Sequence, residues 1–119
     1  MSTHITGKNI ELTPAIQQYI EQKIEAFSDV VEEIIAVDVE VDKNMHHKKG
    51  DVFHVRMNVQ IPQHVIHSEE VRDDLYASID VCRDEVVRQL RKVQKKYEAK
   101  KRKARNTRRM LKSMLSFWR

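Results

Sequence analysis

The spacing of apolar residues predicts a short strand and a helix in the first part of the chain. His4–Gly7 is a strand candidate that a glycine closes. Thr13 is a favourable N-cap, and Pro14 fits the first helical position, where its missing N–H costs nothing. The helix is expected to run to about Ser28, since apolar residues recur at spacings of four and three, at Ile16, Ile20, Ile24 and Phe27.

From Glu33 the apolar period changes from 3.6 to 2, which is typical of strands with one buried face. Apolar residues alternate with polar ones at Ile35, Val37, Val39 and Val41, and again at Phe53, Val55, Met57, Val59 and Ile61. The polar run 43–50 between them predicts a hairpin. Pro62 and Gln63 predict a tight turn into a third strand, 64–71. Both of its sides are mixed, so its inward face stays unassigned, which is typical of an edge strand.

A long helix is the strongest prediction of the pattern. Its apolar stripe comprises Leu75, Ile79, Cys82, Val86, Leu90, Val93 and Tyr97, with Asp73 or Asp74 available as N-cap. The opposite side is cationic, with Arg88, Arg91, Lys92, Lys95 and Arg102. A helix that continues to Lys103 would be about 45 Å long, whereas a compact domain of this size is only about 35 Å across. The basic end is therefore expected to project as an arm.

This order, β-α-β-β-β-α, predicts an α+β fold: a two-layer sandwich in which both helices cover one face of a four-stranded sheet, similar to a double-stranded-RNA-binding domain. The first strand should lie parallel to the second through a right-handed crossover, and the later strands should pair antiparallel. Residues 1–103 would form the RNA-binding domain and 104–119 a basic, flexible tail. Asp38, Glu40 and Asp42 should make the outer sheet face acidic, so we expect nucleic acid to bind on the helix side.

The charge of the 119-residue chain is strongly polarised. Residues 1–80 carry a net charge of −8 and residues 81–119 a net charge of +12, which the total of +4 conceals. Twelve Lys and Arg lie between Arg88 and Arg109, with Glu98 as the single acid. A run of one sign repels itself, which favours a polyanionic partner. No helix-turn-helix, zinc-finger or basic-zipper pattern is present, so structured RNA is favoured over DNA.

Other chemistries find little support in the residues. Two glycines leave no phosphate-binding loop, and the single cysteine, Cys82, forms no internal disulfide and belongs to the apolar stripe. No stretch reaches the ~20 apolar residues of a membrane span, and the N-terminus lacks a signal-peptide pattern, so a cytoplasmic location is expected. The His46–His47 pair is a weak metal candidate, and His54 and His67 are more simply polar neighbours on a solvated sheet. We expect no catalysis, cofactor, metal, membrane or small-molecule substrate.

Four motifs in the predicted order resemble one protein family. They are Ile5-Thr6-Gly7-Lys8-Asn9, Glu11-Leu12-Thr13-Pro14-Ala15-Ile16, Asp74-Leu75-Tyr76-Ala77-Ser78-Ile79-Asp80 and Arg88-Gln89-Leu90 with Lys92. Over about residues 1–97 the chain is similar to the family of the short ribosome hibernation-promoting factor and the ribosome-associated inhibitor A, which includes sigma-54 modulation and ribosomal subunit interface proteins.

The resemblance implies a stress or stationary-phase factor, monomeric off the ribosome, that binds the small ribosomal subunit. It would lie between head and body near the decoding centre, block mRNA and tRNA binding and inhibit translation. A general structured-RNA-binding module or RNA chaperone is the alternative. By motif, the implied rRNA contacts are Lys8, Lys23, Arg88 and Lys92. Tyr76 would either pack under the last helix or contact RNA at its rim, and packing is favoured.

Other site candidates come from the helix itself. Glu85 and Ala26 stand where relatives often carry lysine, and Arg72 where they often carry glycine, so Arg83 and Arg91 are expected to compensate. The remaining candidate phosphate contacts are Lys95, Lys96, Lys100 and Arg102. Residues 106–119 place Met110, Leu111, Met114, Leu115 and Trp118 on one helical side. A basic amphipathic segment of this kind can lie on a membrane, dock on a protein or run along RNA with Trp118 stacking, and the alternative is a frayed end. We hypothesise that it extends along the mRNA path.

Overall fold

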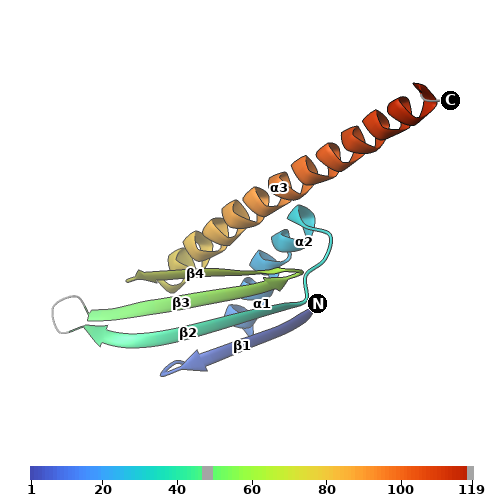
Figure 1. The fold of residues 1–119 in the computed structure, drawn as a ribbon. Helices are drawn as coiled ribbons and strands as arrows, with labels where there is room; N and C mark the ends of the chain where they lie inside the picture. Colours follow the sequence, from blue (N-terminus) through green and yellow to red (C-terminus); the bar gives the residue numbers. More distant parts are fainter. Residues whose placement is uncertain (47–49, 118–119) are drawn as a thin grey trace.

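The computed structural model describes residues 1–46 and 50–117 and has the predicted α+β architecture (Figure 1). The elements are β1 (Ser2–Lys8), α1 (Pro14–Ile24), α2 (Ala26–Val30), β2 (Ala36–His46), β3 (Gly50–Ile61), β4 (His64–Arg72) and α3 (Leu75–Phe117). The sheet order is β1-β2-β3-β4. As predicted, β1 is parallel to β2, whereas β2–β3 and β3–β4 are antiparallel.

The first helical segment starts as predicted but is divided in two. Thr13 caps α1, since its hydroxyl oxygen accepts a hydrogen bond from the Ile16 N–H at 3.3 Å. The predicted single helix to Ser28 was wrong, because α1 ends at Ile24 and α2 begins at Ala26. The Ser28 N–H bonds to the carbonyl of Glu25, three residues back, so the helical hydrogen-bond spacing tightens at this point.

The strands bury the predicted faces with one exception. Ile35 was expected to face inward, but it precedes β2 and is 44% exposed, while its N–H bonds to the Gln60 carbonyl at 2.8 Å. β4 pairs only with β3, which confirms it as an edge strand. Its inward face, unassigned from sequence, carries Ile66 and Ser68, because these residues lie opposite the buried Val59 and Met57 of β3.

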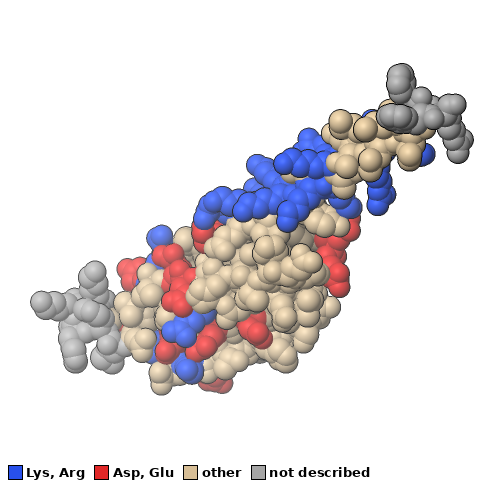
Figure 2. Space-filling model, in the orientation of Figure 1, with Lys and Arg blue, Asp and Glu red and all other residues tan. Residues whose placement is uncertain are grey.

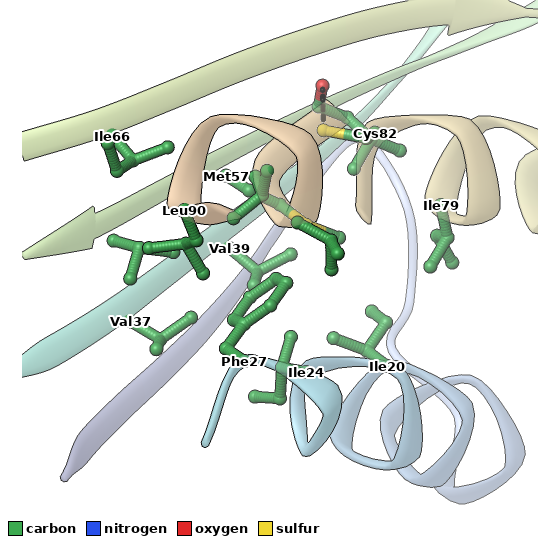
Figure 3. Close-up of a cluster of buried hydrophobic side chains, with 14 of the residues drawn as sticks. Ile20, Ile24, Phe27, Val37, Val39, Met57, Ile66, Ile79, Cys82 and Leu90 are labelled. Carbon is green, nitrogen blue, oxygen red and sulfur yellow. Dashed lines mark hydrogen bonds between the residues drawn. The ribbon is translucent and has the colours of Figure 1, made fainter. Parts of the chain in front are cut away.

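The core lies between the inner sheet face and the helices (Figure 3). Phe27 from α2 and Leu90 from α3 are fully buried there, together with Val39 and Met57 of the central strands. Cys82 is also fully buried, as its place in the stripe predicts, and burial raises the pKa of its thiol to about 11. Because side chains of α3 belong to this packed core, the core fixes the position of α3 on the sheet.

α3 begins at a capped end and then leaves the body. Asp74 is the cap, since its Oδ1 accepts hydrogen bonds from the N–H groups of Tyr76 and Ala77. The helix has 43 residues, about 65 Å at 1.5 Å per residue. The predicted projecting arm is therefore present and longer than expected, as the 78 Å longest dimension reflects (Figure 1). Tyr97, expected in the buried stripe, is 53% exposed because the body ends before it.

We call residues 95–117 of α3 the arm. Every side chain described in it, from Lys95 to Leu115, is exposed. The helix passes through residue 103 without interruption, so the division into a domain and a tail at that point stays a prediction. None of the described helices combines the length and apolar character that crossing a membrane requires.

Candidate nucleic-acid interface

Four cations of α3 form an exposed row where the helix is still packed on the body. They are Arg88, Arg91, Lys92 and Lys95, which we call the basic ridge. Their spacing of three, one and three residues places them on one side of the helix, while Val86 and Leu90 are buried on the other. In Figure 2, Lys and Arg gather along α3 and extend onto the arm. Packing of the apolar side therefore fixes the direction of the ridge.

A shallow groove of about 400 Å³ lies beside the ridge, between α2 and α3. Val30 and Val87 contribute apolar lining, and Arg83, Arg91 and Lys95 contribute cations. The Arg83 Nε is buried and has no hydrogen-bond partner among the described residues, although it lies 3.2 Å from Asp84 Oδ1. A second hollow of about 430 Å³ shares Arg83 and Arg91 and extends to Arg88 and Lys92. Apolar and cationic side chains beside each other suit a sugar–phosphate backbone, whereas Asp29 and Asp84, which also line these hollows, oppose its charge.

The ridge cations differ in whether a carboxylate of the protein already neutralises their charge. Arg88 donates from Nε and Nη2 to the carboxylate of Glu85, at 2.9 and 2.6 Å. This contact, with a further bond from Gln89, lowers the pKa of Glu85 to about 2 and raises the pKa of Arg88. Within the described residues, Arg91, Lys92 and Lys95 form no ion pair. These three are therefore the more available phosphate ligands.

Lys23 belongs to a cluster that the sequence did not reveal. Its Nζ lies 3.3 Å from Asp80 Oδ1 and 5.2 Å from the centre of the Tyr19 ring. The Tyr19 hydroxyl donates to the same carboxylate oxygen at 2.6 Å, which raises the pKa of Tyr19 to about 12. Burial opposes ionisation of Asp80, but the bonds from Tyr19 and Lys23 outweigh it and lower its pKa. Only the packing of α1 on α3 joins Tyr19 and Asp80, which lie 61 positions apart in the sequence.

Tyr76 lies at the edge of this cluster. Its ring packs edge-on against Tyr19, with the ring centres 4.7 Å apart, while 43% of its surface stays exposed. The favoured packing role therefore agrees with the structure, although the contact is at the surface and not in the core. A role in RNA binding stays a prediction.

The other site candidates lie apart from the ridge. Lys96, Lys100 and Arg102 are exposed on the arm. Lys8 is at the end of β1, and its Nζ lies 3.2 Å from the carboxylate of Glu40, which points to the outer sheet face. The structure thus brings Lys23 and Arg83 close to the ridge on the helix side but places Lys8 in the opposite layer.

The outer sheet face carries paired charges. The Glu69 carboxylate lies within 3.4 Å of side-chain nitrogen atoms of His67, His54 and Arg56. The hydrogen bonds from the two histidines lower the pKa of Glu69. The two histidines are thus joined through Glu69 on a solvated face, and His67 Nδ1 also bonds to Asn58. No cluster of His, Cys, Asp and Glu suited to a metal ion is found among the described residues. His47 and the side chain of His46 lie outside that part of the chain.

The chain is similar to known proteins. The sigma 54 modulation protein / S30EA ribosomal protein family matches residues 3–98. Ribosome hibernation promotion factors of Bacillus subtilis and of a Picosynechococcus species are 29% and 33% identical, over 84% and 85% of this chain. The chain spans about half the length of these relatives, 52% and 53%.

Solved structures show the same fold. The N-terminal domain of Thermus thermophilus Protein Y aligns with a TM-score of 0.64 and 26% identity, over 78% of this chain and 99% of that one. A ribosomal subunit interface protein from Coxiella burnetii gives the same TM-score at 24% identity, over 83% and 99%. The family match, over residues 3–98, takes in the four strands from Thr3 onward and ends within the first four residues of the arm.

Proposed function

The chain belongs to the sigma 54 modulation protein / S30EA ribosomal protein family, and on that premise we propose that it is a ribosome hibernation factor that binds the small ribosomal subunit. The names of its relatives support a role on the ribosome. The observation that carries the proposal for this chain is the basic ridge, in which three exposed cations form no ion pair with the described residues and stand on a helix whose other side is packed. The role is binding, with no catalytic step.

The factor would occupy the cleft between head and body near the decoding centre. There a folded body blocks mRNA and tRNA by occupying their space, while rRNA phosphates hold the ridge. Translation is thereby inhibited in stress or stationary phase, in the cytoplasm. A helix-side interface is supported by charge, because the outer sheet face carries Asp38 and Asp42, which repel phosphates, while Glu40 and Glu69 pair with cations of that face.

The arm would extend from this site along the mRNA path. Its basic residues continue the ridge beyond the body, so they can follow an RNA-lined channel that the body itself does not fill (Figure 2). Two acidic groups lie at the base of the arm: Glu98 on the arm itself and Glu32 of the body, which line a hollow with Tyr97 and Arg102.

Lys8 gives the orientation a separate test. If Lys8 contacts rRNA, as the motif implies, the β1 edge of the outer face must also approach RNA. Lys8→Glu should then weaken binding, whereas Arg56→Glu at the centre of the same face should not. If both variants bind as tightly as the unmodified chain, Lys8 does not belong to the interface, and only the helix side contacts RNA.

The function is tested by co-sedimentation with purified small subunits in the presence of excess bulk RNA, at several salt concentrations. A hibernation factor should stay with the subunits and inhibit translation in a purified system. Equal partition between subunits and bulk RNA, without inhibition, would instead favour a general RNA-binding module or chaperone.

A further inference from the structure

The arm has two parts of different chemistry. Residues 95–109, which we call the collar, carry charge on all sides, because Lys100, Lys101, Arg102 and Lys103 are consecutive and consecutive helical residues point about 100° apart. Beyond it, four exposed apolar side chains form what we call the tip: Met110 (67% exposed), Leu111 (54%), Met114 (57%) and Leu115 (68%). In Figure 2 the surface changes from blue to tan at this point.

The tip is a compact apolar patch and not a scatter of side chains. Met110 and Met114, like Leu111 and Leu115, are four residues apart, so the two pairs form adjacent rows on one side of the helix. Such spacing is the pattern of helices that bind in apolar grooves, and methionine adapts to irregular grooves. No described residue of the body covers the patch, because the arm has already left the body.

Charge and size exclude a second copy of the chain as the occupant. Arg108, Arg109 and Lys112 flank the patch, so two arms brought together would repel each other. The patch is also only about 9 Å long over its six residues. A dimer held by the tip alone would bury far less than the about 800 Å² on each partner that a stable interface between two proteins needs, whereas on a subunit the ridge and the collar would bind as well.

Two other occupants fit poorly. RNA bases stack on aromatic rings, whereas the four described side chains of the tip are aliphatic or thioether; Trp118, which the sequence places on the same helical side, lies outside the described residues. A lipid surface would need a long apolar side, but Lys100 is eleven residues from Leu111 and thus on the same side, and Arg108 is one turn away. An occupant must accept the two turns of the tip and leave these cations outside.

We propose that the tip docks in a short apolar pocket, rimmed by carboxylates, on a protein of the small ribosomal subunit. The pocket accommodates Leu111, Met114 and their neighbours, and the carboxylates pair with Arg108, Arg109 and Lys112. The inference rests on the proposed function and deepens it: rRNA would bind the collar, and a protein would bind the tip.

The first test is photocrosslinking within purified complexes of the full chain and small subunits. A photoreactive phenylalanine analogue at Met114 should crosslink to a ribosomal protein, giving a product that resists ribonuclease and is lost on protease treatment. The same analogue at Lys103 should crosslink to rRNA. Crosslinks from position 114 only to rRNA or to a second copy of the chain, or none above background, would overturn the proposal.

A pair of matched variants supplies the second test. Leu111→Asp and Ser113→Asp add the same charge. The two positions are two residues apart in a helix, so their side chains lie on opposite sides of the arm. Leu111→Asp should weaken subunit binding roughly tenfold relative to Ser113→Asp, with an unchanged salt slope. The double substitution Leu111→Ala/Leu115→Ala should also weaken binding, and because alanine favours helix, the arm should stay helical in this variant.

The outcomes separate the two proposals. If the unmodified chain binds subunits but Leu111→Asp binds as well as Ser113→Asp, only the tip inference fails. If the unmodified chain does not bind, both fail. Flotation with vesicles of phosphatidylcholine and phosphatidylglycerol should leave the chain unbound; flotation that Leu111→Asp abolishes would replace the protein pocket by a lipid surface.

Discussion

Arg88 donates two hydrogen bonds to Glu85, at 2.9 and 2.6 Å, and so neutralises within the protein a cation that the family motif assigns to rRNA. The two residues are three positions apart on the exposed side of α3. To bind a phosphate, Arg88 must either leave Glu85 or bring a carboxylate close to the phosphate. Glu85 therefore acts against RNA binding at the N-terminal end of the ridge.

Removal of this carboxylate charge should strengthen RNA binding. Glu85→Gln is expected to raise the affinity for small subunits and to steepen the salt slope by about one phosphate contact, which titrations at several salt concentrations would measure. Since the pKa of Glu85 is about 2, the carboxylate is ionised from pH 5 to 9, and the gain should be constant over that range. An unchanged affinity would mean that Arg88 does not contact RNA.

Charge reversal in the ridge should weaken binding. Arg91→Glu/Lys95→Glu removes two unpaired cations beside the groove, and we expect at least a roughly tenfold loss of affinity and a salt slope that is shallower by about two. The control is Arg56→Glu on the outer sheet face, which should leave both quantities unchanged. Equal losses in both variants would show that long-range charge, and not a positioned contact, governs binding.

The cluster of Tyr19 and Asp80 should stabilise the packing of α1 on α3. Tyr19→Phe removes the 2.6 Å hydrogen bond and is expected to lower the free energy of unfolding by about 1 kcal/mol, measured by urea denaturation. RNA binding should be unchanged in this variant, because Tyr19→Phe leaves the charges of Lys23 and Asp80 and the ion pair between them in place. A loss of RNA affinity without a loss of stability would instead assign Tyr19 to the interface.

The same cluster predicts a dependence of stability on pH. The folded-state pKa of Asp80 is lowered, so its stabilising contribution is present above the unfolded pKa of about 3.9 and is lost as the pH falls through the folded pKa. Asp80→Asn should therefore be less stable than the unmodified chain at pH 7, with a difference that shrinks below pH 4. A difference that is constant with pH would exclude this contribution.

The Cys82 thiol should be unreactive in the folded protein. At pH 8 a thiol with a pKa of about 8.5 is roughly a quarter ionised, whereas burial raises the pKa of Cys82 to about 11. Alkylation by iodoacetamide should therefore be slower than in urea by roughly two orders of magnitude or more. Rapid alkylation under native conditions would show that α3 separates from the sheet.

The arm should contribute to binding through its charge. Deletion of residues 106–119 removes Arg108, Arg109, Lys112 and Arg119 and is expected to weaken subunit binding, most strongly at low salt. Circular dichroism would verify that the body keeps its fold. Unchanged affinity at all salt concentrations would contradict an arm that follows the mRNA path.

The sequence by itself determined the element order, the sheet topology and the cationic side of α3. These features follow from local periodicity and caps: Thr13 and Asp74 start their helices, and the alternation of Val37, Val39 and Val41 sets a buried face. Such signals lie within a few residues of each other, so they can be identified without a fold. The family motifs added the expected partner.

Only the tertiary structure decided which cations are free and where they point. The contact of Lys23 with Asp80, the position of Lys8 beside Glu40 and the buried Nε of Arg83 depend on residues that packing and strand pairing bring together. The inward face of β4 was likewise decided by its pairing with β3. Tyr97 and the tip continue the apolar pattern of α3, but they are exposed because the sheet ends first, and periodicity alone does not reveal where a partner surface ends.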